Sequence, residues 1–312
     1  MASPVFSSNY NGDVLDYIIQ ESVLGLQAVE KGSIYAIENV SEKISIAKMV
    51  ASANPIGNRE AMPTTKTATV TWSEATLEPR DMMVYIPDIN PRVFESAWRE
   101  FQPKGALPDK VLDPQIQKVF ADVVLKQIQN QLGRLIWQGS TALGSTNPLR
   151  FFDGYITRAQ ASGTNIDVPN VAAITAANIL AILEDCNNYV PDALFEDPDM
   201  VFHMSTTTYR LYQEALRATT YKGLAYESGA AGQFAGREIR HYSGFPNNVV
   251  LVCKASTGQD SNLYLATDKV RDTENLVIAK LRPEGEHYFL KALFKMDTAF
   301  SIDSESVYYI GS

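Results

Sequence analysis

Histidine, cysteine and carboxylate side chains could bind a metal ion or carry out acid–base and nucleophilic chemistry, but this sequence spaces them poorly for either purpose. Its three histidines, His203, His241 and His287, lie far apart, and none falls in an HExxH pattern. Its two cysteines, Cys186 and Cys253, lie in a helix-like and a strand-like stretch, and neither is expected to be an activated thiol. These residues predict no nucleophile and no metal site, and His203 is expected to be a core or interface residue in a buried strand.

Three other groupings resemble functional motifs only in part. Glu284, Glu286 and His287 form an acidic cluster that a solvated loop between strands explains. The glycines of Gly229–Gly236 are spaced GxxGxxxG, which matches neither the dinucleotide-binding fingerprint nor the phosphate-binding loop. Asp197–Asp199 (DPD) could offer carboxylates to calcium, but a turn is the simpler interpretation. We expect no catalytic residue, no cofactor and no metal ion, although a triad assembled from distant residues would leave no local motif.

The composition is that of an ordinary globular chain, since 45% of its 312 residues are hydrophobic and 20% are charged. The formal net charge of −9 argues against a dedicated nucleic-acid binder with a basic face, but not against a protein that encloses nucleic acid. The amino terminus lacks the features of a secretory signal, and the longest apolar runs, such as Val249–Cys253, are too short to span a membrane. The sequence predicts a soluble protein with reduced thiols, made in the cytoplasm without membrane contact.

One long amphipathic helix is the element along which the others are expected to be arranged. Asp113 can cap its first turn, Pro114 suits the first helical position, and Gly139 is expected to end it in a left-handed turn. The apolar stripe follows the i, i+3, i+4, i+7 spacing of one helix face and includes Phe120, Val124, Ile128 and Leu135. The pattern predicts a spine helix over 113–138.

An extended hairpin is predicted over residues 51–88. Residues 65–76 alternate, with Thr69 and Thr71 on one face and Trp72 on the other, and a return strand follows over 82–89. The proline-containing turn at 77–81 would place a group of charges at the hairpin tip, namely Glu74, Glu78, Arg80 and Asp81. A two-stranded ribbon is marginally stable by itself. It is therefore either an edge hairpin on its own domain or an arm that lies across a neighbouring subunit.

The remaining sequence predicts both helices and strands, which gives an α+β fold. Helices are expected over residues 13–30, 91–101, 172–189 and 206–218, and a turn followed by a strand over 147–159. A buried strand is expected at 200–204, and later strands at 238–242, 249–253, 262–266, 276–280, 288–296 and 307–310. A long Gly- and Ala-rich loop is expected over 219–236.

The order of these elements resembles one family, the major capsid proteins of tailed double-stranded-DNA bacteriophages with the HK-ninety-seven-like fold. The segment Leu135–Ile156 is similar to the family's junction after its spine helix. The matching places are occupied by Gly139, Pro148, Gly154 and Ile156. Pro198–Leu216 resembles the family's buried strand with a Met–Ser turn before a helix, and Gly236–Asn248 resembles a later strand with a Gly-x-Pro turn. The resemblance covers most of residues 50–312, through order and loose pattern and without a single diagnostic motif.

The resemblance implies a division of the chain. An N-terminal arm and helix would occupy residues 1–50, an E-loop hairpin 51–88, a peripheral domain 89–164, an axial domain 165–268, and returning C-terminal strands 269–312. The axial loop near the symmetry axis would contain Tyr221, Lys222, Tyr226 and Phe234. The hairpin residues named above would contact an adjacent subunit, and Trp72, Phe94 and Trp98 would be either interface anchors or core residues.

The implied function is structural: hexamers and pentamers would tile an icosahedral capsid around double-stranded DNA, without sequence-specific binding. The shell would be assembled in the cytoplasm of a host bacterium, with a separate scaffolding protein, a portal and a decoration protein as partners. The family's prototype cross-links through an E-loop lysine, whereas no lysine lies between Thr67 and Pro103 here, which leaves Lys66 at the hairpin's base and predicts a shell without covalent cross-links. The alternatives are an encapsulin-type nanocompartment that holds cargo enzymes, another phage structural component, and a soluble α+β enzyme or ligand-binding protein.

Overall fold

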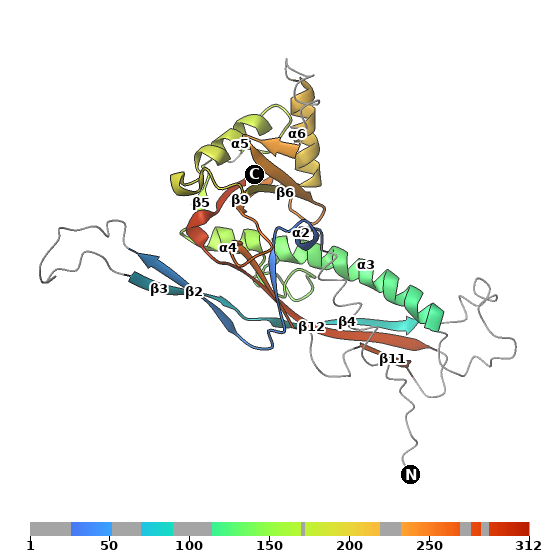
Figure 1. Ribbon diagram of the computed structural model, residues 1–312. Coiled ribbons are helices and arrows are strands. Elements are labelled where there is room, and N and C mark those ends of the chain that lie inside the picture. Colours follow the sequence, from blue (N-terminus) through green and yellow to red (C-terminus); the bar gives the residue numbers. More distant parts are fainter. Residues whose placement is uncertain are drawn as a thin grey trace, which may run out of the picture.

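The computed structural model describes residues 26–51, 70–89, 114–169, 172–218, 232–268, 276–281 and 287–311 (Figure 1). The helices are α2 (Gln27–Glu30), α3 (Pro114–Gln138), α4 (Tyr155–Ala161), α5 (Ile179–Asn188) and α6 (Thr206–Ala218), with 3-10 turns η2 (Asp192–Leu194) and η4 (Asp303–Glu305). The strands are β1 (Tyr35–Glu38), β2 (Ile44–Ala51), β3 (Val70–Leu77), β4 (Arg80–Ile89), β5 (Ile166–Asp167), β6 (Met200–Ser205), β7 (Gln233–Phe234), β8 (Arg237–Tyr242), β9 (Val249–Lys254), β10 (Leu263–Asp268), β11 (Leu276–Lys280), β12 (Tyr288–Phe300) and β13 (Val307–Ile310). This mixture confirms the predicted α+β class.

A six-stranded sheet in the order β5-β13-β9-β6-β8-β7 forms one half of the molecule, at the top of Figure 1. Its central strands β6 and β9 are buried on both faces, which explains why their sequences are continuous apolar runs and not alternating ones. Through Phe202, Val250 and Val252, one face packs in a core shared with α5 and α6. Through Leu251 and Cys253, the other face packs in a core shared with α3. The sheet therefore separates two apolar cores.

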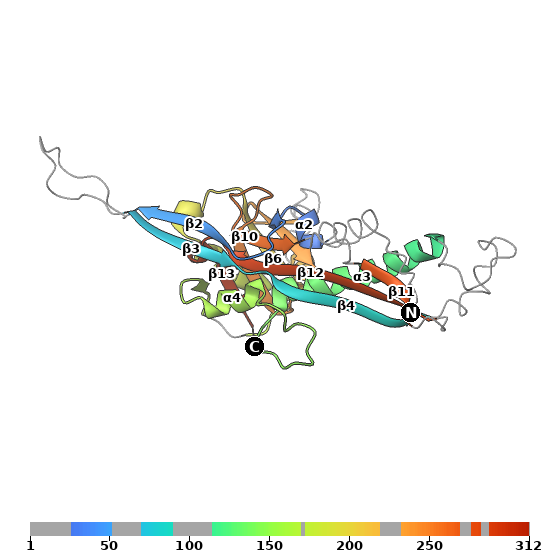
Figure 2. The same ribbon diagram turned by 90° about the horizontal axis from the view of Figure 1, so that it is seen from below.

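The second sheet has the order β1-β10-β12-β11, with β4 also paired to β12, and α3 lies along it (Figures 1 and 2). The predicted spine helix is confirmed as α3, and Val124, Ile128 and Leu135 are buried in its core as the apolar stripe predicts. Asp113 and the side chain of Phe120 lie outside the described residues. The predicted domain boundary at residue 268 does not separate the two sheets. β10, which precedes it, belongs to the second sheet, and β13, which follows it, belongs to the six-stranded sheet.

The carboxyl end of α3 packs backbone against backbone. Gly139 is not left-handed, so the reason predicted for this glycine is wrong. Its N–H donates to the carbonyl oxygen of Leu135 at 2.9 Å, and its own carbonyl oxygen accepts from the N–H of Gly154 at 2.9 Å. A Cβ atom at Gly139 would overlap the carbonyl oxygens of Phe152 and Leu135, and one at Gly154 would lie 2.7 Å from that of Ile136. Glycine is needed here for close approach of two chain segments.

A second glycine contact joins α3 to the six-stranded sheet. A Cβ atom at Gly244, in the turn between β8 and β9, would overlap the backbone of Gly133. The side-chain N–H of Gln138 also donates to the carbonyl oxygen of Gly244 at 2.7 Å. Between these contacts, the Trp137 ring packs against Tyr242 with 5.2 Å between ring centroids. The last turn of α3 therefore fixes where the six-stranded sheet sits.

Two local predictions are corrected. Residues 155–161 form α4 and not a strand, because Tyr155, Ile156 and Ala159 bury one helical face despite their β-forming types. The helix predicted over 172–189 begins only at Ile179, because the Asn178 side chain accepts from Thr175 and holds a turn before it. Of the helix predicted over 13–30, only residues 26–30 are described, and α2 lies within them.

We expect Gly139→Ala to destabilise the subunit and Gly133→Ala to leave it unchanged or slightly stabilised. The first adds a methyl group where carbonyl oxygens already lie, and such overpacking costs about 1–3 kcal/mol or more. The second adds a methyl group with nothing within 4 Å and improves helix propensity by up to about 1 kcal/mol. Urea unfolding of the purified subunit measures both, and equal effects of the two changes would contradict the close-approach argument.

Candidate functional site: the projecting ribbon and its anchor

A two-stranded ribbon leaves the body of the molecule, and its pairing differs from the sequence prediction. β2 pairs antiparallel with β3 along their whole length, from Ile44 opposite Leu77 to Ala51 opposite Val70. β4 pairs instead with β12, so β3 and β4 do not form the predicted hairpin. They follow one another along one line, out of the sheet and into the ribbon (Figure 2). Leu77, the last residue of β3, is fully buried in a core that also contains Tyr264 and Ala266 of β10, so this end of the ribbon is held against the sheet.

The charges predicted at a hairpin tip lie elsewhere. Glu74 is exposed on β3 within the ribbon. Glu78, Arg80 and Asp81 lie where the ribbon meets the body: Arg80 is 3.5 Å from the Glu78 carboxylate, and Lys295 is 3.3 Å from that of Asp81. The tip prediction is therefore wrong for these three residues. Such exposed ion pairs contribute about 1 kcal/mol or less to stability.

One face of the ribbon exposes a group of large apolar side chains. Trp72 is 71% exposed, Met49 directly opposite it is 59% exposed, and Val70, two residues along the same face, is 50% exposed. We call Met49, Val70 and Trp72 the ribbon patch. Of the two roles predicted for Trp72, the structure excludes the core of its own subunit. Large exposed apolar side chains grouped on one face mark an interaction surface.

Several predicted contact residues cannot be placed. Thr69 and the side chain of Thr71 lie outside the described residues. So do Phe94, Trp98 and the axial-loop residues Tyr221, Lys222 and Tyr226. Phe234 is described in β7, where its ring meets those of Phe202 and Tyr212 edge-on at centroid distances of 5.8 Å and 6.4 Å. It is therefore part of the packing of its own sheet.

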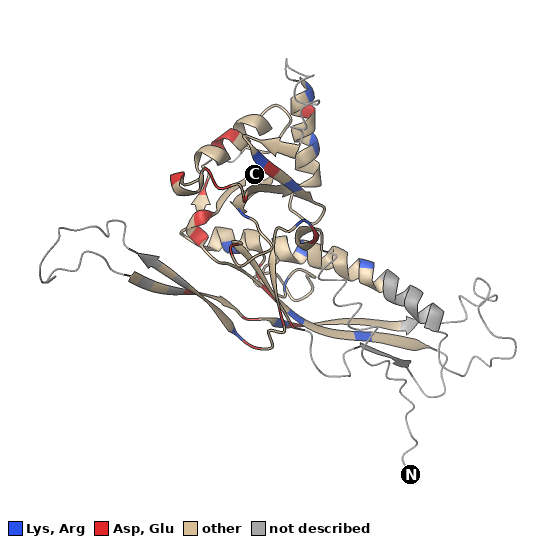
Figure 3. Ribbon diagram, viewed as in Figure 1, with Lys and Arg blue, Asp and Glu red and all other residues tan. Residues whose placement is uncertain are grey.

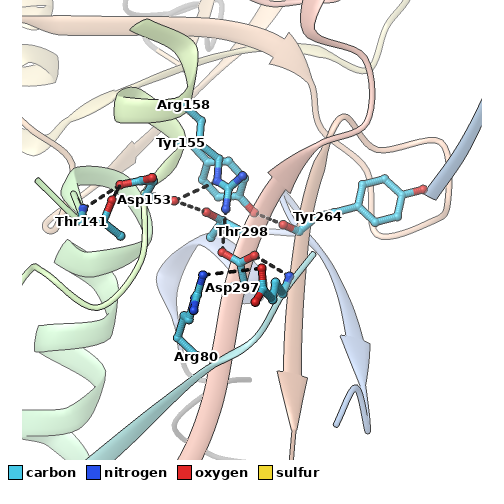
Figure 4. A network of polar contacts seen from close by, with 9 residues as sticks. Arg80, Thr141, Asp153, Tyr155, Arg158, Tyr264, Asp297 and Thr298 are labelled. Atoms are coloured by element: carbon cyan, nitrogen blue, oxygen red, sulfur yellow. Dashed lines mark hydrogen bonds and ion pairs between the residues drawn. The ribbon is translucent and has the colours of Figure 1, made fainter. Parts of the chain in front are cut away.

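The base of the ribbon is anchored by a buried carboxylate (Figure 4). Asp297 of β12 is 3% exposed and accepts from the guanidinium of Arg158 at 2.7 Å and from the backbone N–H of Glu78 at 2.8 Å. Burial raises the pKa of Asp297, while the charge of Arg158 and the N–H of Glu78 oppose that rise. The carboxylate thus joins three elements: the ribbon base, α4 and the five-stranded sheet.

The anchor continues towards the end of α3 through the backbone of Asp153. Its carbonyl oxygen accepts from Arg158 Nε at 3.0 Å and from the hydroxyl of Thr298 at 2.7 Å. Its carboxylate accepts from the backbone N–H and the hydroxyl of Thr141 at 2.7 Å and 2.9 Å. One network of hydrogen bonds therefore runs from the loop after α3 to the ribbon (Figure 4).

These anchor residues were not singled out in the sequence. The available signal was Asp297 itself, a carboxylate within the long apolar strand 288–300, because a charge in such a strand needs a partner. The partner, Arg158, lies 139 residues away and no sequence pattern points to it.

His203 of β6 is fully buried, as expected of a core residue. Its ring Nδ1 is 3.0 Å from the hydroxyl of Tyr242, whose oxygen is also 2.6 Å from that of Ser33. Its Nε2 has no hydrogen-bond partner among the described residues. Burial lowers the pKa of His203 to about 3, so the ring is neutral at pH 7.

The described residues give little sign of ligand chemistry. No group of three or more His, Cys, Asp or Glu side chains among them could hold a metal ion. Both cysteines are buried, and burial raises the pKa of Cys186 to about 12. Asp197 is paired with Lys254 at 2.9 Å and holds the turn predicted for 197–199. A cavity of about 110 Å³ between α2, α3 and the turn after β8 is smaller than the roughly 300 Å³ of a small-molecule site. No helix in the described part of the chain is long and apolar enough to cross a membrane.

Comparison with known proteins gives a match in structure alone, since no protein-family model and no curated protein matches the sequence. The satellite phage P4 procapsid matches with a TM-score of 0.67 and 12% identity, over 99% of this chain and 93% of that one. The capsid of Myoviridae phage XM1 matches with a TM-score of 0.58 and 11% identity, over 100% and 96%. A virus-like particle from Pyrococcus furiosus matches with a TM-score of 0.51 and 9% identity, over 96% and 99%. The chain therefore has the HK-ninety-seven-like fold, as its resemblance implied.

We expect Arg158→Met to lower the free energy of unfolding by about 3 kcal/mol, because it leaves the buried carboxylate of Asp297 without its cation. Adding Asp297→Asn to that variant should recover part of the loss, because the unpaired charge is then removed. The matched control is Arg80→Met, which breaks an exposed pair and should cost less than about 1 kcal/mol. Chemical denaturation measures the cycle, and strictly additive single effects would contradict a coupled anchor.

We expect acid to destabilise the subunit through His203. In the unfolded chain this ring takes a proton below a pH of about 6.5, whereas in the fold it resists protonation down to a pH of about 3. The unfolding free energy therefore falls as the pH drops through this window, by up to about 1.4 kcal/mol per pH unit from this group. Comparing His203→Gln with the exposed-site control His287→Gln between pH 6.5 and 4.5 isolates the effect. An unchanged pH slope in His203→Gln would contradict it.

Proposed function

We propose that this chain is the subunit of a self-assembling capsid shell of a tailed double-stranded-DNA phage. The observation that carries the proposal is the ribbon patch, held away from the body of a subunit with a capsid fold. A Trp side chain that is 71% exposed beside a 59% exposed Met is costly to leave in water. Covering Trp72 in a partner would contribute at most about 4 kcal/mol, at ~25 cal/mol per Å² of apolar surface.

The ribbon suits an arm better than an edge hairpin. Along β2 and β3 its only strand pairing is between these two strands, within the part of the chain described. At its base, Ile44 and Ile46 pack against buried Leu77, while farther out the ribbon patch has no such cover. The ribbon packs against its own subunit only at its base. Its outer apolar face would therefore be stabilised most by packing on the surface of a second copy. We therefore assign the contact with an adjacent subunit to Met49, Val70 and Trp72.

The finer assembly is also part of the proposal. Hexamers and pentamers of the chain would enclose double-stranded DNA, after assembly in the host bacterial cytoplasm on a separate scaffolding protein, with a portal and a decoration protein as further partners. The net charge of −9 supports this role, because a shell that bound phosphates tightly through Lys and Arg would hinder packaging.

The absence of covalent cross-links stays a prediction, but the position of Lys66 on which it was based is different in the structure. With β2 paired to β3, Lys66 falls in the connection between the two strands and not at the base of the ribbon. Its placement lies outside the described residues. The gel in the experiment below therefore tests Lys66 directly.

A shell that encloses something other than a genome is the second candidate. The match to the virus-like particle from Pyrococcus furiosus favours it, although with a lower TM-score than the phage procapsid, 0.51 against 0.67. The content of native particles separates the two: packaged double-stranded DNA supports the capsid, and packaged protein supports the compartment.

We expect the purified chain, alone or with its scaffolding protein, to form rings or closed shells in electron micrographs. Trp72→Ser should retain the circular dichroism spectrum and melting temperature of the parent but lose assembly by at least tenfold, because only the ribbon patch changes. Leu143→Ser, at an exposed leucine in the loop after α3, is the matched control and should assemble normally. On a denaturing gel the particles should give one band at 34.5 kDa, and a ladder that Lys66→Arg removes would overturn the non-covalent shell. Normal assembly of Trp72→Ser would overturn the role of the patch.

A further inference from the structure

The unit built on the six-stranded sheet carries unlike charges on its two flanks (Figure 3). On one side, α5, η2 and the loop into β6 present a set of exposed carboxylates, which we call the acidic flank: Glu184, Asp185, Asp192, Glu196 and Asp199. None of the five forms an ion pair with another residue of the described chain. Within this flank Lys254 is occupied by Asp197, at 2.9 Å.

Two exposed aromatic rings lie within the acidic flank. Tyr189 follows α5 and is 43% exposed, and Phe195 follows η2 and is 52% exposed. Phe195 is held in place from beneath: the guanidinium of Arg237 lies 5.0 Å from its ring centroid and donates to its carbonyl oxygen at 2.7 Å. An aromatic ring that is fixed on one side and half-exposed on the other, on a flank that carries exposed carboxylates, is a surface that favours a guanidinium group.

Helix α6 offers such groups. It lies beside α5 on the same face of the six-stranded sheet (Figure 3), where it packs against β6 and β8, whereas α5 packs against β9 and β13. Arg210 and Arg217 are exposed on α6, seven residues apart and so on one helix face, with Glu214 between them. Arg210 has no ion-pair partner in the described part of the chain. We call Arg210 and Arg217 the cationic face of α6.

We infer that the cationic face of α6 of one copy docks on the acidic flank of the next copy. The guanidinium of Arg210 lies over the open face of Phe195, and the carboxylates of the acidic flank neutralise its charge. Because the two surfaces differ, the contact is head-to-tail and closes into a ring when the rotation between copies allows it. This inference rests on the proposed function, since it names the contact between subunits within a ring.

Charge reversal with restoration tests the contact in the full chain. Arg210→Glu with Arg217→Glu reverses the face of α6, and Asp185→Lys with Glu196→Lys reverses part of the acidic flank. Each pair should lower the assembled fraction at least tenfold at low salt, and the chain with all four changes should recover it. The four-change chain should also fail to co-assemble with the parent chain. Arg150→Glu, at an exposed site in the loop after α3 and away from both flanks, is the matched control and should assemble normally.

A photo-reactive phenylalanine analogue at position 195 of the otherwise unchanged chain identifies the occupant directly. Irradiation of assembled material should link it to a peptide from 206–218 of another copy, and 0.5 M salt should reduce the yield severalfold, because exposed charges are screened. Links to another part of the chain, or to a scaffolding or decoration protein, would overturn the inference while leaving the shell intact. Failure of the parent chain to assemble at all would overturn the proposed function first, and this contact with it.

Discussion

The arrangement of the whole subunit depends on the contact of bare backbones at the last turns of α3. Gly139 meets Gly154 on one side and Gly133 meets Gly244 on the other, and no side chain separates the segments at either place. Trp137 occupies the space between, with its ring 4.8 Å from that of Phe245 and 5.3 Å from that of Tyr155, measured between centroids. Because protein interiors are close-packed and barely compressible, a fixed contact here also fixes the positions of the elements around it. The six-stranded sheet, α4 and the spine are thus fixed relative to one another at a single place.

The direction of the ribbon follows from the same place. α4 starts at the glycine contact and supplies Arg158, which reaches Asp297, which in turn holds the backbone of Glu78. Because β3 and β4 continue along one line, the ribbon is an extension of the sheet and not a separate hairpin. An arm tied in this way samples fewer directions, which lowers the entropy lost when it meets a partner. The buried ion pair serves geometry more than stability, since its desolvation offsets much of its attraction.

Local patterns in the sequence predicted the helices and strands better than they predicted which strands pair and which side chains meet. The 3.6-residue period identified α3 and α6, and apolar runs identified β6 and the strands after residue 236, because these signals depend only on neighbours in the chain. Residues 70–89 were predicted correctly as two strands, but alternation does not say which strand pairs with which. The partner of β3 precedes it across residues 52–69, and that of β4 lies some 200 residues later, so the pairing depends on the whole fold. Trp72 could be named from the sequence, whereas the Arg158–Asp297 anchor could not, because its two halves share no local pattern.

The two proposed contact surfaces differ in physical character, and assembly of a shell would use both. The ribbon patch offers apolar area, which is insensitive to salt and poorly directional. The flanks of the six-stranded unit offer charges, which guide orientation and reject a wrong neighbour but contribute little affinity when exposed. A shell repeats each contact many times, so each needs to be only weak for the whole to be stable. Weak, oriented contacts also dissociate when misplaced, and this is the condition under which a closed shell can form without trapped errors.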